Sequence, residues 1–138
     1  MKRFEDWPAR LVGVIDAAAG KPFAWGQHDC CLFACDCIEA MTGVDPAAPF
    51  RGQYQSRVGA YRALKEYAGT LEDVAHAIAA EKGMRPIRQG EAGRGDLALL
   101  ESQLGDVLGV HCGGVIYAAA PNGLARAPVY HARLHWAV

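Results

Sequence analysis

The chain has no long apolar run, no excess of positive charge and no pair of cysteines at the spacing of a zinc site. No segment reaches the roughly 18 apolar residues that a membrane-spanning helix needs. The formal net charge is −1, and the basic residues are scattered along the chain. The sequence therefore predicts neither a membrane span nor electrostatic binding of nucleic acid.

The N-terminal segment lacks the apolar region of a secretory signal peptide, because only Phe4 separates Lys2 and Arg3 from the acidic Glu5 and Asp6. We therefore expect synthesis in a host cytoplasm, where the five cysteines would be thiols. The 138 residues, 51% hydrophobic and 21% charged, are typical of a globular chain. This length predicts a single domain over residues 1–138.

The first part of the chain is predicted to be helical. Helical spacing of apolar residues places four helices at about 7–18, 30–41, 57–68 and 71–82. Asp29 is a suitable N-cap for the second helix, and Thr70 with Asp73 resembles a capping box before the fourth. A glycine follows each predicted helix and can end it.

The pattern changes to short strands in the last third of the chain. Five are expected, at about 97–101, 107–112, 114–120, 124–129 and 132–138. Asn122-Gly123 is the strongest hairpin signal and lies between the third and fourth of them. Helices followed by a run of strands favour an α+β fold with an antiparallel sheet over a parallel doubly wound fold.

Four of the five cysteines lie in one segment, FAWGQHDCCLFACDCIEAMTG, from Phe23 to Gly43. Cys30 would be the first residue of the second helix, where free N–H groups and the helix dipole lower the pKa of a thiol. The neighbouring carboxylate of Asp29 acts against this effect. Because Cys30 also lies on the apolar stripe of its helix, either a nucleophile or a core residue fits the pattern.

Cys35 and Cys37 are better explained as core residues than as ligands. One continuous helix cannot arrange four sulfur atoms tetrahedrally around zinc, and no His pair at ligand spacing follows it. Disulfides within one helix are also poor in geometry. We therefore predict no metal site and no cofactor.

The motif P-F-A-W-G-Q-H-D-C-C-L-F, beginning at Pro22, resembles the nucleophile motif of NlpC-type cell-wall peptidases, a papain-like cysteine peptidase superfamily. Their motif reads P-Y-x-W-G-G, a short insert, then D-C-S-G-L. The segment R-G-D-L-A-L-L at 94–100 resembles the P-G-D-L strand of that superfamily. The resemblance implies an NlpC-type fold in which the cysteine helix packs on a C-terminal antiparallel sheet. It also implies a set of site residues: Cys30 as nucleophile, with Phe23, Trp25, Gly26, His28 and Asp29 around it.

A closer likeness is to a phage-tail family related to these peptidases. Its members carry T-G-x-D-P, then F-R-G-x-Y, and end near A-W-R-V. The chain has T-G-V-D-P at 42–46, F-R-G-Q-Y at 50–54 and H-W-A-V at 135–138. The likeness implies a tail-tip protein of a phage or prophage, located in the virion tail and assembled with other tail proteins.

The catalytic base of the resembled peptidases is a His that opens a strand in the motif H-V-G-I-Y. The segment GDVLGVHCGGVIY fits this motif in two registers. One makes His111 the base, whereas the other aligns Gly109-Val110 with G-I and puts Val107 in the His position. The registers differ by four residues, about 13 Å along a strand. Asn122 and His131 are the candidates for a third catalytic group.

Two functions remain open at this point. As a peptidase, the chain would use Cys30 to attack peptide bonds of peptidoglycan and His111 to move the proton. As a degenerate relative, it would be a structural protein of tail assembly without peptidase activity. Phe23 in place of the motif's Tyr, and Cys31-Leu32 in place of Ser-Gly, favour the second function.

Overall fold

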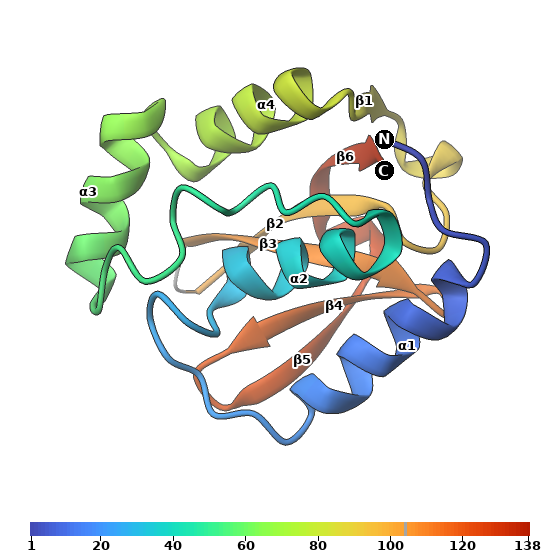
Figure 1. The fold of residues 1–138 in the computed structure, drawn as a ribbon, viewed down its shortest axis with the longest axis horizontal. Helices are drawn as coiled ribbons and strands as arrows, with labels where there is room; N and C mark the ends of the chain where they lie inside the picture. The colour runs from blue at the N-terminus through green and yellow to red at the C-terminus, as the bar shows by residue number, and fades with distance from the viewer. Residues whose placement is uncertain (104) are drawn as a thin grey trace.

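The structure is a computed structural model that describes residues 1–103 and 105–138 (Figure 1). Within these residues, four α helices come first: α1 (Trp7–Ala18), α2 (Cys30–Thr42), α3 (Arg57–Tyr67) and α4 (Leu71–Lys82). Six strands follow: β1 (Arg85–Ile87), β2 (Leu97–Ser102), β3 (Gly105–Cys112), β4 (Val115–Ala120), β5 (Gly123–Pro128) and β6 (Ala132–Ala137). Short 3₁₀ turns occupy Gln89–Glu91 and Val129–His131.

The described strands form one sheet in the order β1-β6-β2-β3-β4-β5, and every neighbouring pair is antiparallel. The predicted α+β class with an antiparallel sheet is therefore confirmed. The hairpin at Asn122-Gly123 is also confirmed, because Ala120 pairs with Gly123 across the β4–β5 turn. Strand β1 was not predicted, since it has three residues and includes Pro86.

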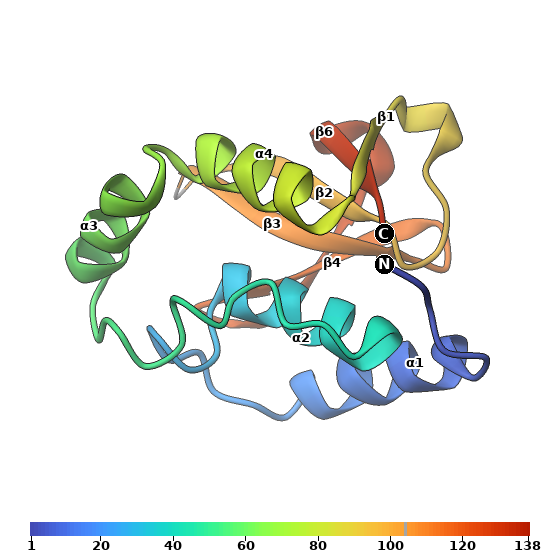
Figure 2. The same ribbon diagram turned by 45° about the horizontal axis from the view of Figure 1, so that its top comes forward.

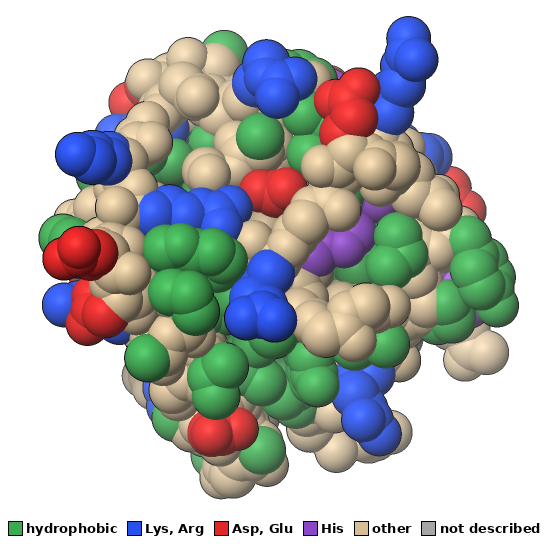
Figure 3. All heavy atoms as spheres, turned by 90° about the vertical axis from the view of Figure 1, so that its right-hand side faces the viewer, with side chains coloured by type: hydrophobic (Ala, Val, Ile, Leu, Met, Phe, Trp, Pro, Cys, Tyr) green, Lys and Arg blue, Asp and Glu red, His purple; other side chains and the backbone are tan. Residues whose placement is uncertain are grey.

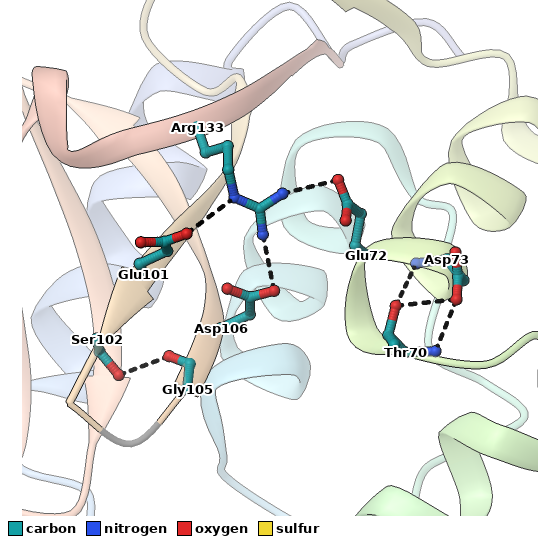
Figure 4. Close-up of polar contacts among 8 residues, drawn as sticks. All are labelled: Thr70, Glu72, Asp73, Glu101, Ser102, Gly105, Asp106 and Arg133. Atoms are coloured by element: carbon teal, nitrogen blue, oxygen red, sulfur yellow. Dashed lines mark hydrogen bonds and ion pairs between the residues drawn. The ribbon is translucent and has the colours of Figure 1, made fainter.

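Helix ends follow the capping residues of the sequence. The Asp29 carboxylate accepts a hydrogen bond from the Leu32 N–H at the start of α2, and Gly43 ends that helix at φ 78°. Thr70 and Asp73 form the predicted capping box of α4, with the Thr70 N–H donating to Asp73 at 2.9 Å (Figure 4). Local sequence therefore sets where Cys30 stands, at the first position of α2.

Helix α2 is the centre of the main core. Its side chains Leu32, Phe33, Ala34, Cys37 and Ile38 are completely buried. Helix α1 runs beside it, as Figure 2 shows, and β3 packs across it. The predicted apolar stripe is thus a core surface, with only its first member, Cys30, partly exposed.

The sheet has a second, smaller apolar cluster on its other face. Side chains alternate along a strand, so Leu97, Leu99, Leu108 and Val110 join the α2 core while their neighbours point away from it. The second cluster consists of Ala98, Leu100, Ile116 and Ala118, with Val107, Ala127 and Ala132 packed against it. Residues of this second cluster also line the cavity of the candidate site.

No helix among the described residues is long and apolar enough to cross a bilayer, as the sequence predicted. On the face shown in Figure 3, Lys and Arg side chains are separated by apolar, acidic and neutral ones. That face offers no continuous basic surface for a phosphate backbone.

Substituting Gly109 tests how closely β3 and β4 approach each other. A Cβ at this position would lie 2.6 Å from Ile116 Cγ2 and 2.7 Å from the Tyr117 carbonyl oxygen. We expect Gly109→Ala to lower the free energy of unfolding by about 1–3 kcal/mol through overpacking. Urea denaturation measures it.

Gly13→Ala is the matched control, because nothing lies within 4 Å of a Cβ at this exposed position in α1. It should raise the free energy of unfolding by roughly 0.5–1 kcal/mol through helix propensity. Equal effects of the two substitutions would contradict the close contact at Gly109.

Candidate functional site: a cavity beside Cys30

An apolar cavity of about 850 Å³ opens at the N-terminus of α2. Its walls come from α3, from the loop before α2 and from the β2–β3 and β4–β5 hairpins, which lie at one end of the molecule in Figure 1. Six of the predicted site residues line it: Phe23, Trp25, Asp29, Cys30, Asn122 and His131. The structure therefore brings together four residues of the cysteine motif and both candidates for a third catalytic group, whereas Gly26, His28 and His111 are not in the lining.

The buried carboxylate of Asp29 fixes the start of α2. One oxygen accepts the Leu32 N–H at 3.0 Å, and the other accepts the Gly26 N–H at 3.0 Å and the Tyr54 hydroxyl at 2.6 Å. Asp29 is only 1% exposed, so these three donors replace the water that the carboxylate would otherwise bind. Asp29 therefore acts first as a structural anchor for the cysteine helix.

Gly26 and Tyr54 join two motifs that are far apart in the sequence. Gly26 has φ 80°, and a Cβ on it would run into the Tyr54 carbonyl oxygen. The Gly52 N–H donates to the Gly26 carbonyl oxygen at 2.9 Å. A glycine is thus required at position 26 by backbone conformation and by close approach. The sequence assigned no role to Tyr54, although its motif was visible.

Arg51 makes a second link to α2. Its guanidinium donates to both carboxylate oxygens of Asp45, at 2.7 and 3.0 Å, and lies 2.8 Å from the Asp36 carboxylate of α2. The T-G-V-D-P and F-R-G-Q-Y motifs are therefore joined to each other and to the cysteine helix. The charged residues of these two motifs stabilise the fold and are not assigned to a chemical step.

The Cys30 thiol is not activated. Its partly exposed side chain lies among apolar groups, and this desolvation raises the pKa of the thiol to about 12. The neighbouring Cys31 and Asp29 raise it further, whereas backbone hydrogen bonds with Leu108 and Cys31 lower it. The helix N-terminus therefore does not overcome the loss of solvent, and the thiolate is scarce at neutral pH.

Val107, and not His111, lines the cavity with Cys30. The Cys30 sulfur is next to the Leu108 backbone, and His111 is three residues farther along β3, about 10 Å away. The pair of Cys30 and His111 that the first register requires is not formed. Val107 lines the same cavity, but its side chain packs with the second cluster on the sheet face away from α2.

The imidazole of His111 has a different partner. Its Nε2 lies 2.9 Å from Nδ1 of His135, on the sheet face that carries the second cluster. Burial lowers the pKa of both rings, and His135 lowers that of His111 further. Both imidazoles are therefore neutral at pH 7, and one donates its proton to the other in a buried hydrogen bond.

His28 is buried behind the site, with its ring 6.1 Å from Phe33 and no partner for Nδ1 among the described residues. Burial and then Lys21 lower the pKa of His28. Cys35 and Cys37 are buried, as predicted for core residues, and Cys31 is buried as well. No group of three or more potential metal ligands occurs in residues 1–103 and 105–138.

Removing the Tyr54 hydroxyl tests the anchoring role of Asp29. In Tyr54→Phe the buried carboxylate loses its shortest hydrogen bond. We expect the free energy of unfolding to fall by about 1.5–3 kcal/mol, the usual value of a hydrogen bond to a charged group. Urea denaturation monitored by circular dichroism measures it.

Tyr61→Phe is the control, since the Tyr61 hydroxyl accepts only an exposed hydrogen bond from Arg57 at 3.2 Å. Its effect should stay within about 0.5 kcal/mol. A Tyr54→Phe protein as stable as the control would show that Asp29 does not depend on this donor.

Comparison with known proteins places the chain in one family. The family model described as Domain of unknown function (DUF6950) matches residues 2–138, nearly the whole chain. No curated protein matches the chain. The motifs that hold Asp29 and the cavity beside Cys30 all lie inside the matched region, and the chain belongs to the DUF6950 family.

Proposed function

We propose that this chain is a tail-tip protein of a phage or prophage which has an NlpC-type fold without peptidase activity. It acts in tail assembly by binding other tail proteins. The absent catalytic pair carries the proposal: the Cys30 thiol lies against the Leu108 backbone, and His111 is bonded to His135.

Cysteine peptidase chemistry needs a thiolate and a base that can reach it. Burial raises the pKa of the Cys30 thiol to about 12, so the thiol is protonated at pH 7. The aliphatic side chain of Val107 cannot accept the proton. The site therefore supports binding better than it supports acyl transfer.

The tail assignment rests on the sequence motifs, and the contacts of those motifs support its fold. Residues from all three segments, Asp29, Arg51 and Asp45, hold α2 in place through buried or partly buried bonds. A chain that needs only the fold would keep these contacts without a catalytic base, and the contacts support the proposal in this way.

A peptidoglycan endopeptidase is the second candidate, because His131 and Asn122 line the same cavity as Cys30. In that case His131 would have to replace His111 as the base. The two candidates differ in whether the Cys30 sulfur is needed for function.

Cys30→Ala separates the two candidates in a phage or prophage that carries the gene. We expect a strain deleted for the gene to lose infectious tails, and both wild type and Cys30→Ala to restore them fully. The number of plaque-forming particles and electron micrographs of tails measure this. Restoration by wild type alone would contradict the proposal.

Purified protein provides a second readout. Incubation with crosslinked peptidoglycan should release no more soluble muropeptides from the wild type than from Cys30→Ala. Wild-type-specific release, analysed by chromatography and mass spectrometry, would establish the endopeptidase instead.

A further inference from the structure

Resting on the proposed function, we propose that the cavity beside Cys30 binds a segment of a partner protein that carries a bulky apolar side chain next to a Lys or Arg. The apolar side chain, aromatic or branched aliphatic, fills the cavity. The cation contacts the carboxylates of Glu101 and Asp106, which line the same cavity.

The size and lining of the cavity fit an apolar anchor. Its volume of about 850 Å³ lies within the range of about 300–1,000 Å³ that is common for binding pockets. Trp25, Leu64, Val107 and Ile116 supply large apolar walls. The β4–β5 side is lined by small side chains: Ala118, Ala119, Ala120, Ala125 and Ala127. These short side chains leave this part of the cavity wide enough for a bulky apolar side chain.

The rim beside β2 and β3 is negatively charged. Arg133 of β6 contacts three carboxylates, those of Glu72 at 2.7 Å, Glu101 at 3.4 Å and Asp106 at 2.8 Å (Figure 4). One guanidinium shared by three carboxylates leaves this cluster with a formal charge of −2. The Glu101 side chain is 73% exposed, so it can meet a cation from outside.

Charge complementarity selects the partner. A peptide with free carboxylates, such as a peptidoglycan stem peptide, would meet like charges at Glu101 and Asp106. A basic segment meets opposite charges there. Arg57 of α3 also lines the cavity, and its guanidinium donates a hydrogen bond to the Tyr61 hydroxyl. Exposed charges of this kind govern partner choice and association rate, while burial of the apolar anchor supplies the affinity.

The experiment screens the purified full chain against a bead-bound library of random heptapeptides with blocked ends. Beads that bind the wild type are sequenced, and binding of the enriched peptides is measured by fluorescence anisotropy. We expect the enriched sequences to combine Phe, Trp, Leu or Ile with an adjacent Lys or Arg.

Two substitutions in the cavity and one control outside it test where the enriched peptides bind. Ala125→Trp places a large ring in the cavity from an exposed position of β5 and should weaken binding at least tenfold. Glu101→Gln removes one rim charge and should weaken binding about two- to fivefold, as expected for an exposed ion pair. Glu5→Gln, the same change at an exposed residue outside the cavity lining, should have no effect.

Three results would overturn the inference: no enriched sequence, an enriched sequence of acidic or purely polar residues, or binding that Ala125→Trp leaves unchanged. Any of these, together with full restoration of tails by Cys30→Ala, would leave the proposed function in place. Hydrolysis of peptidoglycan by the wild type would overturn the proposed function independently.

Discussion

The hydrogen bonds of the buried Asp29 carboxylate are the constraint on which the rest of the structure depends. They fix the first turn of α2, the tight turn at Gly26 and the tyrosine of the segment that follows α2. A carboxylate buried to this degree is tolerated only while its oxygens are satisfied. The position of Cys30, next in the chain, is therefore a consequence of an anchoring network that does not itself require any chemistry.

Scaffold and chemistry are separate in this molecule. The contacts of the scaffold are present: Arg51 forms ion pairs with Asp36 of α2 and with Asp45 of the loop after α2, and so holds the loop against the helix. No activated Cys–His pair stands on this scaffold, because burial keeps the Cys30 thiol protonated and His111 is bonded to His135. The cavity beside Cys30 is nevertheless open and apolar, as a binding site requires.

Capping chemistry made the helices predictable from sequence, because Asp29 and Thr70 act on residues a few positions away. The two registers at His111 and Val107 could not be separated from sequence, since positions four apart on a strand face the same side. In the structure Cys30 meets β3 at the Leu108 backbone, and Val107 packs with the second cluster on the other face of the sheet. The bond from Tyr54 to Asp29 spans 25 residues, and no local pattern indicated it.

The pH dependence of Cys30 alkylation, resolved by mass spectrometry, shows directly whether an imidazole activates this thiol. We expect a slow wild-type thiol with a pKa of about 12 that His111→Ala leaves unchanged. A wild-type thiol that titrates below about pH 8.5, and whose pKa rises in His111→Ala, would contradict this expectation.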